Sequence, residues 1–115
     1  MDLKQRRKRL RYKLKYLTNR PRLSIHKTNK YIYVQLIDQK TGDVLASYDT
    51  KRLVKEFPDT EQLDGLEKAF KMGEILGQRI LSRKINEIVF DRSGYKYHGK
   101  IKAVAEGLRK AGLKF

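Results

Sequence analysis

Ten residues near the end of the chain combine two glycines with aromatic and basic side chains. In order they are Asp91-Arg92-Ser93-Gly94-Tyr95-Lys96-Tyr97-His98-Gly99-Lys100. Glycines allow a backbone to turn tightly, tyrosine rings can stack on unpaired bases, and cations contact phosphates. This mixture predicts binding to single-stranded or looped RNA. The residues alone leave open an alternative, a connecting loop whose tyrosines cover the core.

A second basic patch is expected on the polar face of the first predicted hairpin. Its members are Arg20, Arg22, His26, Lys27, Asn29, Lys30 and Tyr31. The alternative is a solvent-facing strand edge, which proteins often protect with Lys and Arg. The dense positive charge that precedes this patch favours an interaction surface.

The positive charge is concentrated at the start of the chain. The whole sequence has 28 Lys and Arg against 13 Asp and Glu, a formal net charge of +15. Residues 1–19 contribute Lys4, Arg6, Arg7, Lys8, Arg9, Arg11, Lys13 and Lys15. A block of like charges repels itself until a polyanion neutralises it. Leucines 3, 10, 14 and 17 share one helical face, so we expect a basic arm that becomes helical on a polyanion.

Other chemistry finds little support in the sequence. The absence of cysteine excludes disulfides and thiolate catalysis. No stretch approaches the roughly 18 uncharged apolar residues of a membrane span. Asp91 and His98 could be imagined as a nuclease pair, but Asp91 is more simply expected to cap the loop or pair with Arg92. We therefore predict no catalysis, metal, cofactor, small-molecule substrate or membrane partner.

Hydrophobic spacing places these residues on an α/β fold. Alternation with a period of two predicts strands at residues 23–26, 31–38 and 44–50, joined as an antiparallel meander. Residues 51–59 are expected to be a polar connection, after which Asp59 and Gln62 would cap a helix running to about Leu81. Gly73 and Gly77 lie one turn apart, which suggests close packing of that helix against a sheet.

The remaining elements complete a mixed sheet. The apolar run at residues 85–90 predicts a buried strand, and the order strand, helix, strand implies a right-handed crossover with parallel pairing. A last helix follows with Ile101, Val104 and Leu108 on one face, and it stops at Gly112. The prediction is a single α/β domain at residues 20–115, with two main helices, preceded by the arm at 1–19.

Four stretches of the chain resemble one known family. They are residues 20–38, 45–47, 89–103 and 108–115, and the most specific reads Phe90-Asp91-Arg92-Ser93-Gly94-Tyr95-Lys96-Tyr97-His98-Gly99. The chain resembles bacterial large-subunit ribosomal protein eighteen, a 5S rRNA-binding family. Two residues depart from the family pattern: Ser93 stands where many members have glycine, and Tyr48 where a small residue is usual.

The resemblance implies a structural protein of the cytoplasmic ribosome, where it binds 5S rRNA and helps attach it to 23S rRNA in the central protuberance. Neighbouring ribosomal proteins are expected partners. The implied contacts come from the arm and from Arg20, Arg22, His26, Lys27, Asn29, Lys30, Thr50, Lys51, Arg92, Gly94, Tyr95, Lys96, Tyr97, His98 and Lys100. Two alternatives stay open, a free-standing nucleic-acid-binding module and, third, a small nuclease.

Overall fold

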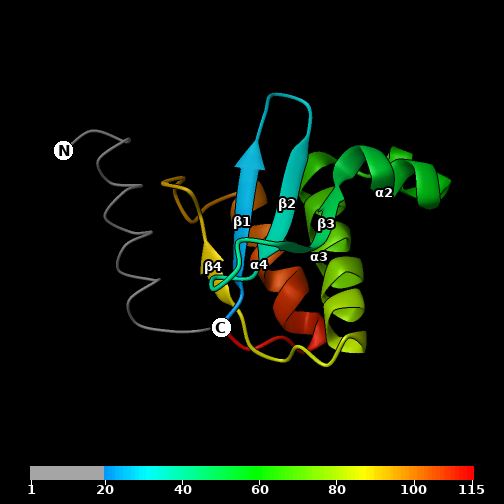
Figure 1. Cartoon of the computed structure of the whole chain (residues 1–115). Coiled ribbons are helices and arrows are strands. Elements are labelled where there is room, and N and C mark those ends of the chain that lie inside the picture. Colours follow the sequence, from blue (N-terminus) through cyan, green and yellow to red (C-terminus); the bar gives the residue numbers. More distant parts are fainter. Residues whose placement is uncertain (1–19) are drawn as a thin grey trace.

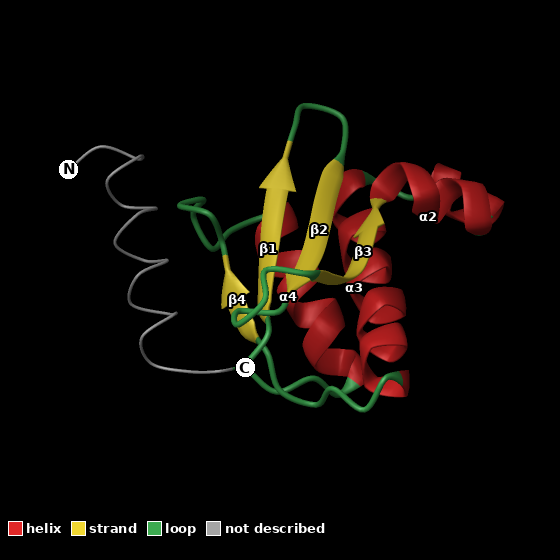
Figure 2. Ribbon diagram, viewed as in Figure 1, coloured by secondary structure: helices red, strands yellow, loops and turns green. Residues whose placement is uncertain are grey.

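A four-stranded mixed sheet carries two long helices on one of its faces (Figures 1 and 2). The computed structural model describes residues 20–115. Its elements are β1 (Arg22–Lys27), β2 (Ile32–Ile37), β3 (Val44–Asp49), α2 (Thr50–Glu56), the 3-10 helix η1 (Pro58–Gln62), α3 (Gly65–Ser82), β4 (Val89–Asp91) and α4 (Lys100–Ala111). The predicted fold class is confirmed.

The order of the strands is β3-β2-β1-β4. β1 and β2 are antiparallel, as are β2 and β3, whereas β4 runs parallel to β1 with Leu23 opposite Phe90. Alternate residues of β1 and β2 point to the helices, so Leu23, Ile25 and Val34 are buried. The meander and the parallel pairing both agree with the sequence prediction.

The glycines of α3 bring two helices together. A methyl group at Gly73 would overlap the carbonyl oxygen of Val104 in α4, and one at Gly107 of α4 would overlap the carbonyl oxygen of Phe70. The prediction that Gly73 and Gly77 pack against a sheet is wrong. They pack on α4, because the absence of side chains allows the two backbones to approach each other.

The segment after β3 also differs from the sequence prediction. β3 ends at Asp49, whose carboxylate accepts a hydrogen bond of 2.7 Å from the Arg52 amide and caps α2. The predicted polar connection is therefore partly helical. α3 begins at Gly65 because Asp64, rather than Asp59, accepts the capping bond, 2.9 Å from the Glu67 amide.

The predicted strand at residues 85–90 is shorter and shifted. β4 contains only three residues, Val89–Asp91. Before it, Ile88 donates its amide to the carbonyl oxygen of Lys114 at 3.1 Å, and Lys114 donates its amide to that of Asn86 at 2.9 Å. These backbone groups therefore pair with the end of the chain and not with β1.

Tyr48 is buried in the core next to α2 and α3. Its hydroxyl donates to Glu56 Oε1 at 2.6 Å, and the Arg79 guanidinium lies 4.8 Å from its ring centre. Burial, followed by the hydrogen bond to Glu56, raises the pKa of Tyr48 to about 12. The same hydrogen bond, together with Arg79, lowers the pKa of Glu56. The large residue at this position is thus accommodated by a polar cluster with paired charges.

Candidate nucleic-acid interface

The glycine-containing loop at residues 92–99 connects β4 to α4. Its first turn is closed by the Tyr95 amide, which donates to the Arg92 carbonyl at 3.0 Å. Ser93 and Gly94 both adopt left-handed backbone angles, with φ of 55° and 84°. The predicted tight turn is confirmed, and it includes one non-glycine residue in a conformation that favours glycine.

Asp91 anchors this loop from below. It is fully buried, and its carboxylate accepts hydrogen bonds from the Ser93 amide at 2.8 Å and from Arg22 Nη1 at 2.7 Å. The expected capping role is confirmed, but the charge partner is Arg22 and not Arg92. Arg22 thus connects β1 to the end of β4. Within residues 20–115, no carboxylate forms an ion pair with Arg92.

Tyr95 joins the loop to the first hairpin. Its hydroxyl lies 3.3 Å from the backbone nitrogen and 3.3 Å from the carbonyl oxygen of Lys27, at the end of β1. The ring also packs against the core. For this tyrosine, the structure agrees with the alternative of a tyrosine that covers the core. The contact brings the two patches predicted from sequence into one surface, which we call the loop–hairpin surface.

The tip of the loop is open to solvent. Lys96, Tyr97 and His98 are exposed, with 37% of the Tyr97 surface accessible. The Tyr97 hydroxyl accepts a hydrogen bond of 3.2 Å from Arg109 Nη1. Its ring is therefore positioned without being buried. Lys100, by contrast, is half-buried and covers Gly65 at the start of α3.

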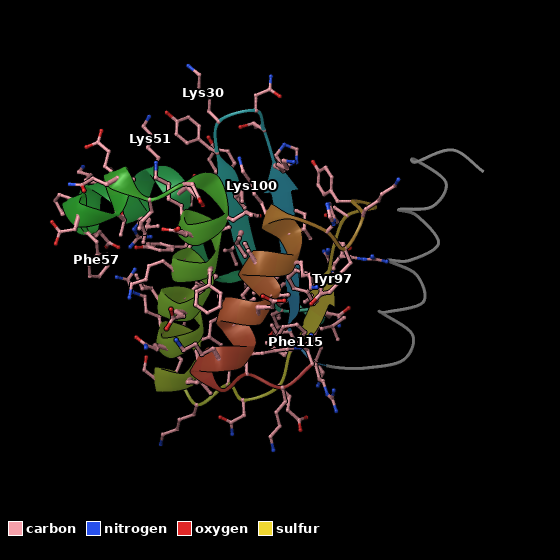
Figure 3. All side chains as sticks on the ribbon, turned by 180° about the vertical axis from the view of Figure 1, so that it is seen from behind. Lys30, Lys51, Phe57, Tyr97, Lys100 and Phe115 are labelled. Carbon is pink, nitrogen blue, oxygen red and sulfur yellow. The ribbon has the colours of Figure 1, made fainter. Side chains whose placement is uncertain are left out.

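The hairpin between β1 and β2 presents a second group of exposed side chains. They are His26, Lys27, Asn29 and Lys30. Lys51 lies beside them, with its ammonium 6.0 Å from the ring centre of Tyr31 (Figure 3). Thr50 differs because it is buried and its hydroxyl accepts the Ile32 amide at 3.2 Å. Of the two predicted site residues Thr50 and Lys51, Lys51 is the one that faces solvent.

The predicted arm, residues 1–19 with its eight cations, lies outside the described residues. Arg109 was not among the site residues predicted from the sequence. The structure places its guanidinium 4.3 Å from the ring centre of Phe115 and next to Tyr97. In the sequence Arg109 stands six residues before Phe115, and this spacing is too common to indicate an interface.

Neither a metal centre nor the imagined nuclease pair is present in the described part. Among residues 20–115, no group of three or more His, Cys, Asp or Glu could hold a metal ion. Asp91 is buried and paired with Arg22, whereas His98 faces solvent. No helix within that range is both long and apolar enough to cross a membrane.

Comparison with known proteins decides the family. A family model described as ribosomal L18 of archaea, bacteria, mitochondria and chloroplasts matches residues 1–115. The chain belongs to this ribosomal L18 family. The resemblance noted in the sequence is therefore confirmed, and so is its consequence that the chain is a constituent of the large ribosomal subunit.

Individual relatives in the L18 family support the same assignment. The large ribosomal subunit protein uL18 of Thermomicrobium roseum is 43% identical over 114 residues, covering 97% of this chain and 90% of the relative. The uL18 proteins of Brachyspira hyodysenteriae and Thermotoga petrophila are 42% and 43% identical, and cover 97% and 96% of this chain and 92% and 90% of their own lengths. The similarity extends over nearly the whole sequence.

Proposed function

We propose that this chain binds 5S rRNA and helps attach it to 23S rRNA in the central protuberance of the large subunit. Neighbouring ribosomal proteins would complete the assembly. The observation that carries the proposal is the contact between Tyr95 and Lys27, which unites loop and hairpin into one surface. Around that contact, the exposed side chains are mostly basic, amide or aromatic.

The proposed mechanism is scaffolding rather than catalysis. Exposed cations of the loop–hairpin surface, together with the arm, would neutralise phosphates and release counterions. Tyr97 and His98 at the loop tip would contact bases that are not paired, because only unstacked bases expose their faces and edges. Asp91, Arg22 and Tyr95 would act indirectly by holding the loop in place. Arg92 and Lys96 supply cations on the loop itself.

The first test compares RNAs. Full-length protein should bind folded 5S rRNA more tightly than a random duplex RNA of equal length at the same salt concentration. Equal affinity for both would favour a free-standing nucleic-acid-binding module. Magnesium-dependent cleavage of the RNA would instead support the nuclease alternative.

The second test compares two exposed lysines at opposite ends of β2. Lys30 lies in the proposed surface, whereas Lys40 lies in the turn between β2 and β3. Lys30→Ala should weaken 5S rRNA binding severalfold more than Lys40→Ala, although both changes remove one positive charge. Equal effects would mean that only the overall charge matters and that the surface is wrongly placed.

A further inference from the structure

A cavity beside β4 was not foreseen from the sequence. It is a depression of about 500 Å³ that is open to solvent. Three arginines and three aromatic residues line it, Arg20, Arg92, Arg109, Phe90, Tyr97 and Phe115. We call it the β4 pocket. Figure 3 shows Tyr97 and Phe115 on the same side of α4, next to β4.

Arg109 forms a fixed flat surface in this pocket. Its Nη1 donates to the Tyr97 hydroxyl at 3.2 Å, and its Nη2 donates to the main-chain oxygen of Phe115 at 3.1 Å. The guanidinium also lies 4.3 Å from the Phe115 ring centre, and that ring stacks on Phe90 with centres 5.5 Å apart. Although these contacts orient it, the Arg109 side chain remains exposed. A planar guanidinium held in this way is a stacking platform for a base.

The charge around the platform favours an anion. Arg20 pairs with Glu87 at 3.1 Å, and about half of each side chain is exposed. Arg92 has no carboxylate partner among residues 20–115. Three arginines line the pocket, and no Asp or Glu is among its lining residues, so basic side chains predominate where a phosphate would bind.

We propose that the β4 pocket takes one unstacked nucleotide of the bound RNA. Its base would stack on the Arg109 guanidinium beside Tyr97, and an adjacent phosphate would contact Arg92 and Arg20. A base within a duplex cannot enter, because its faces are covered by neighbouring pairs. The identity of the ligand as RNA rests on the proposed function, whereas the stacking platform rests on the geometry of Arg109.

Paired variants on α4 test the stacking role. Arg109→Lys keeps the charge but removes the planar group, so affinity for 5S rRNA should fall about tenfold. Lys110→Ala is the control, since Lys110 faces Phe70 at 5.3 Å and Glu74 at 3.7 Å on another side of the helix. It should change affinity less than about threefold. Binding by Arg109→Lys that equals the parent, or a loss just as large in Lys110→Ala, would overturn the proposal.

A second test uses the unaltered protein, so its result does not depend on whether a variant folds. Ultraviolet cross-linking of the complex with 5S rRNA, followed by mass spectrometry, should attach a nucleotide to Tyr97 or Phe115. Cross-links found only at residues outside the β4 pocket would contradict it.

A short single-stranded oligouridylate separates this proposal from the proposed function. It should shift the NMR signals of the Tyr97 and Phe115 rings, while a blunt duplex of equal charge should leave them in place. If the parent protein shows no preference for 5S rRNA but these shifts occur, the pocket stands and the proposed function fails. If 5S rRNA is preferred and the shifts are absent, the pocket is wrong by itself.

Discussion

The guanidinium of Arg22 lies 2.7 Å from the carboxylate of Asp91, a residue 69 positions later in the chain. The carboxylate is almost fully buried and the Arg22 side chain is 21% exposed. Arg22→Ala would remove the cation that pairs with this buried carboxylate, and we expect a loss of about 3 kcal/mol in the free energy of unfolding. Arg92→Ala, which breaks no such pair, should cost less than about 0.5 kcal/mol. Urea denaturation of both variants gives the comparison, and equal losses would refute the assignment of Arg22 as the partner.

Ser93→Gly should stabilise the protein by up to about 1 kcal/mol. The native φ of 55° is costly for a residue with a Cβ atom, and glycine relieves this cost. The lost hydroxyl contact is weak, because Ser24 Oγ lies 3.4 Å away. Ser93→Ala keeps the strained backbone and should give no gain. Thermal melting of the two variants is sufficient, and stabilisation by alanine but not by glycine would contradict the strain argument.

Gly107→Ala should destabilise the protein by about 3 kcal/mol or more. Its methyl group would overlap the carbonyl oxygen of Phe70, a backbone atom that cannot move without separating α3 from α4. Gly42→Ala is a useful control, because no atom lies within 4 Å of the added methyl group and only its φ of 79° is unfavourable. That control should cost about 1 kcal/mol. A larger effect at Gly42 would argue against the close helix contact.

The stability of the protein should depend on Tyr48 at alkaline pH. Its pKa is about 12 when folded and about 10 when unfolded, so the unfolded state loses its proton first. The stabilising contribution is complete below pH 10 and is lost as the pH rises towards 12. Tyr48→Phe should remove this part of the alkaline decline in denaturation midpoints. If the denaturation midpoints of Tyr48→Phe decline with alkaline pH as steeply as those of the parent protein, this role of Tyr48 is contradicted.

Glu56 has the opposite dependence. Because its pKa is lowered from the ordinary 4.5, its contribution is present above that pH and is lost as the pH falls through the folded-state value. Glu56→Gln should flatten the acid side of the stability curve, as followed by circular dichroism. The variant should also be less stable at neutral pH, since Arg79 loses its partner at 3.0 Å.

Removal of residues 1–19 should preserve cooperative unfolding and weaken RNA binding. The described elements of residues 20–115 pack around a shared hydrophobic core, whereas the deleted segment carries eight cations. Each phosphate contact adds up to about 0.9 to the slope of log affinity against log salt, so the truncated chain should have a shallower slope. Thermal melting and salt titrations of both chains provide the test. Loss of cooperative melting would make the arm part of the core.

The sequence predicted those elements whose signals are local. Alternation in β1 and β2 correctly indicated the meander, the order strand, helix, strand indicated the parallel pairing, and the apolar face of α4 indicated the last helix. The start of α3 was misplaced because Asp59 and Asp64 are both suitable capping residues. In the structure Asp59 lies inside η1, and Asp64 accepts the capping hydrogen bond of α3. The partner of Gly73 could not be deduced, since closeness to α4 depends on how distant elements pack.

The same limit applies to the candidate interface. Composition and the family resemblance identified the loop and the hairpin, but the pairing of Asp91 with Arg22 and the contact of Tyr95 with Lys27 span nearly seventy residues. The burial of Thr50 could not be predicted either, because its hydroxyl at the start of α2 bonds to the Ile32 amide at the start of β2. The β4 pocket combines residues from both ends of the described chain, and no local pattern marks such a set.

The short parallel pairing between β1 and β4 also has a kinetic consequence. The strands β1 to β3 are neighbours in sequence and need only short loops to meet, whereas β4 must close a much longer one. We therefore expect the meander to form early and β4 to dock late during synthesis and folding. Because the loop after β4 is held by Asp91, a partly folded chain would lack a properly arranged loop for the proposed RNA contact. Recognition of the RNA would then select for chains that have completed their last step of folding.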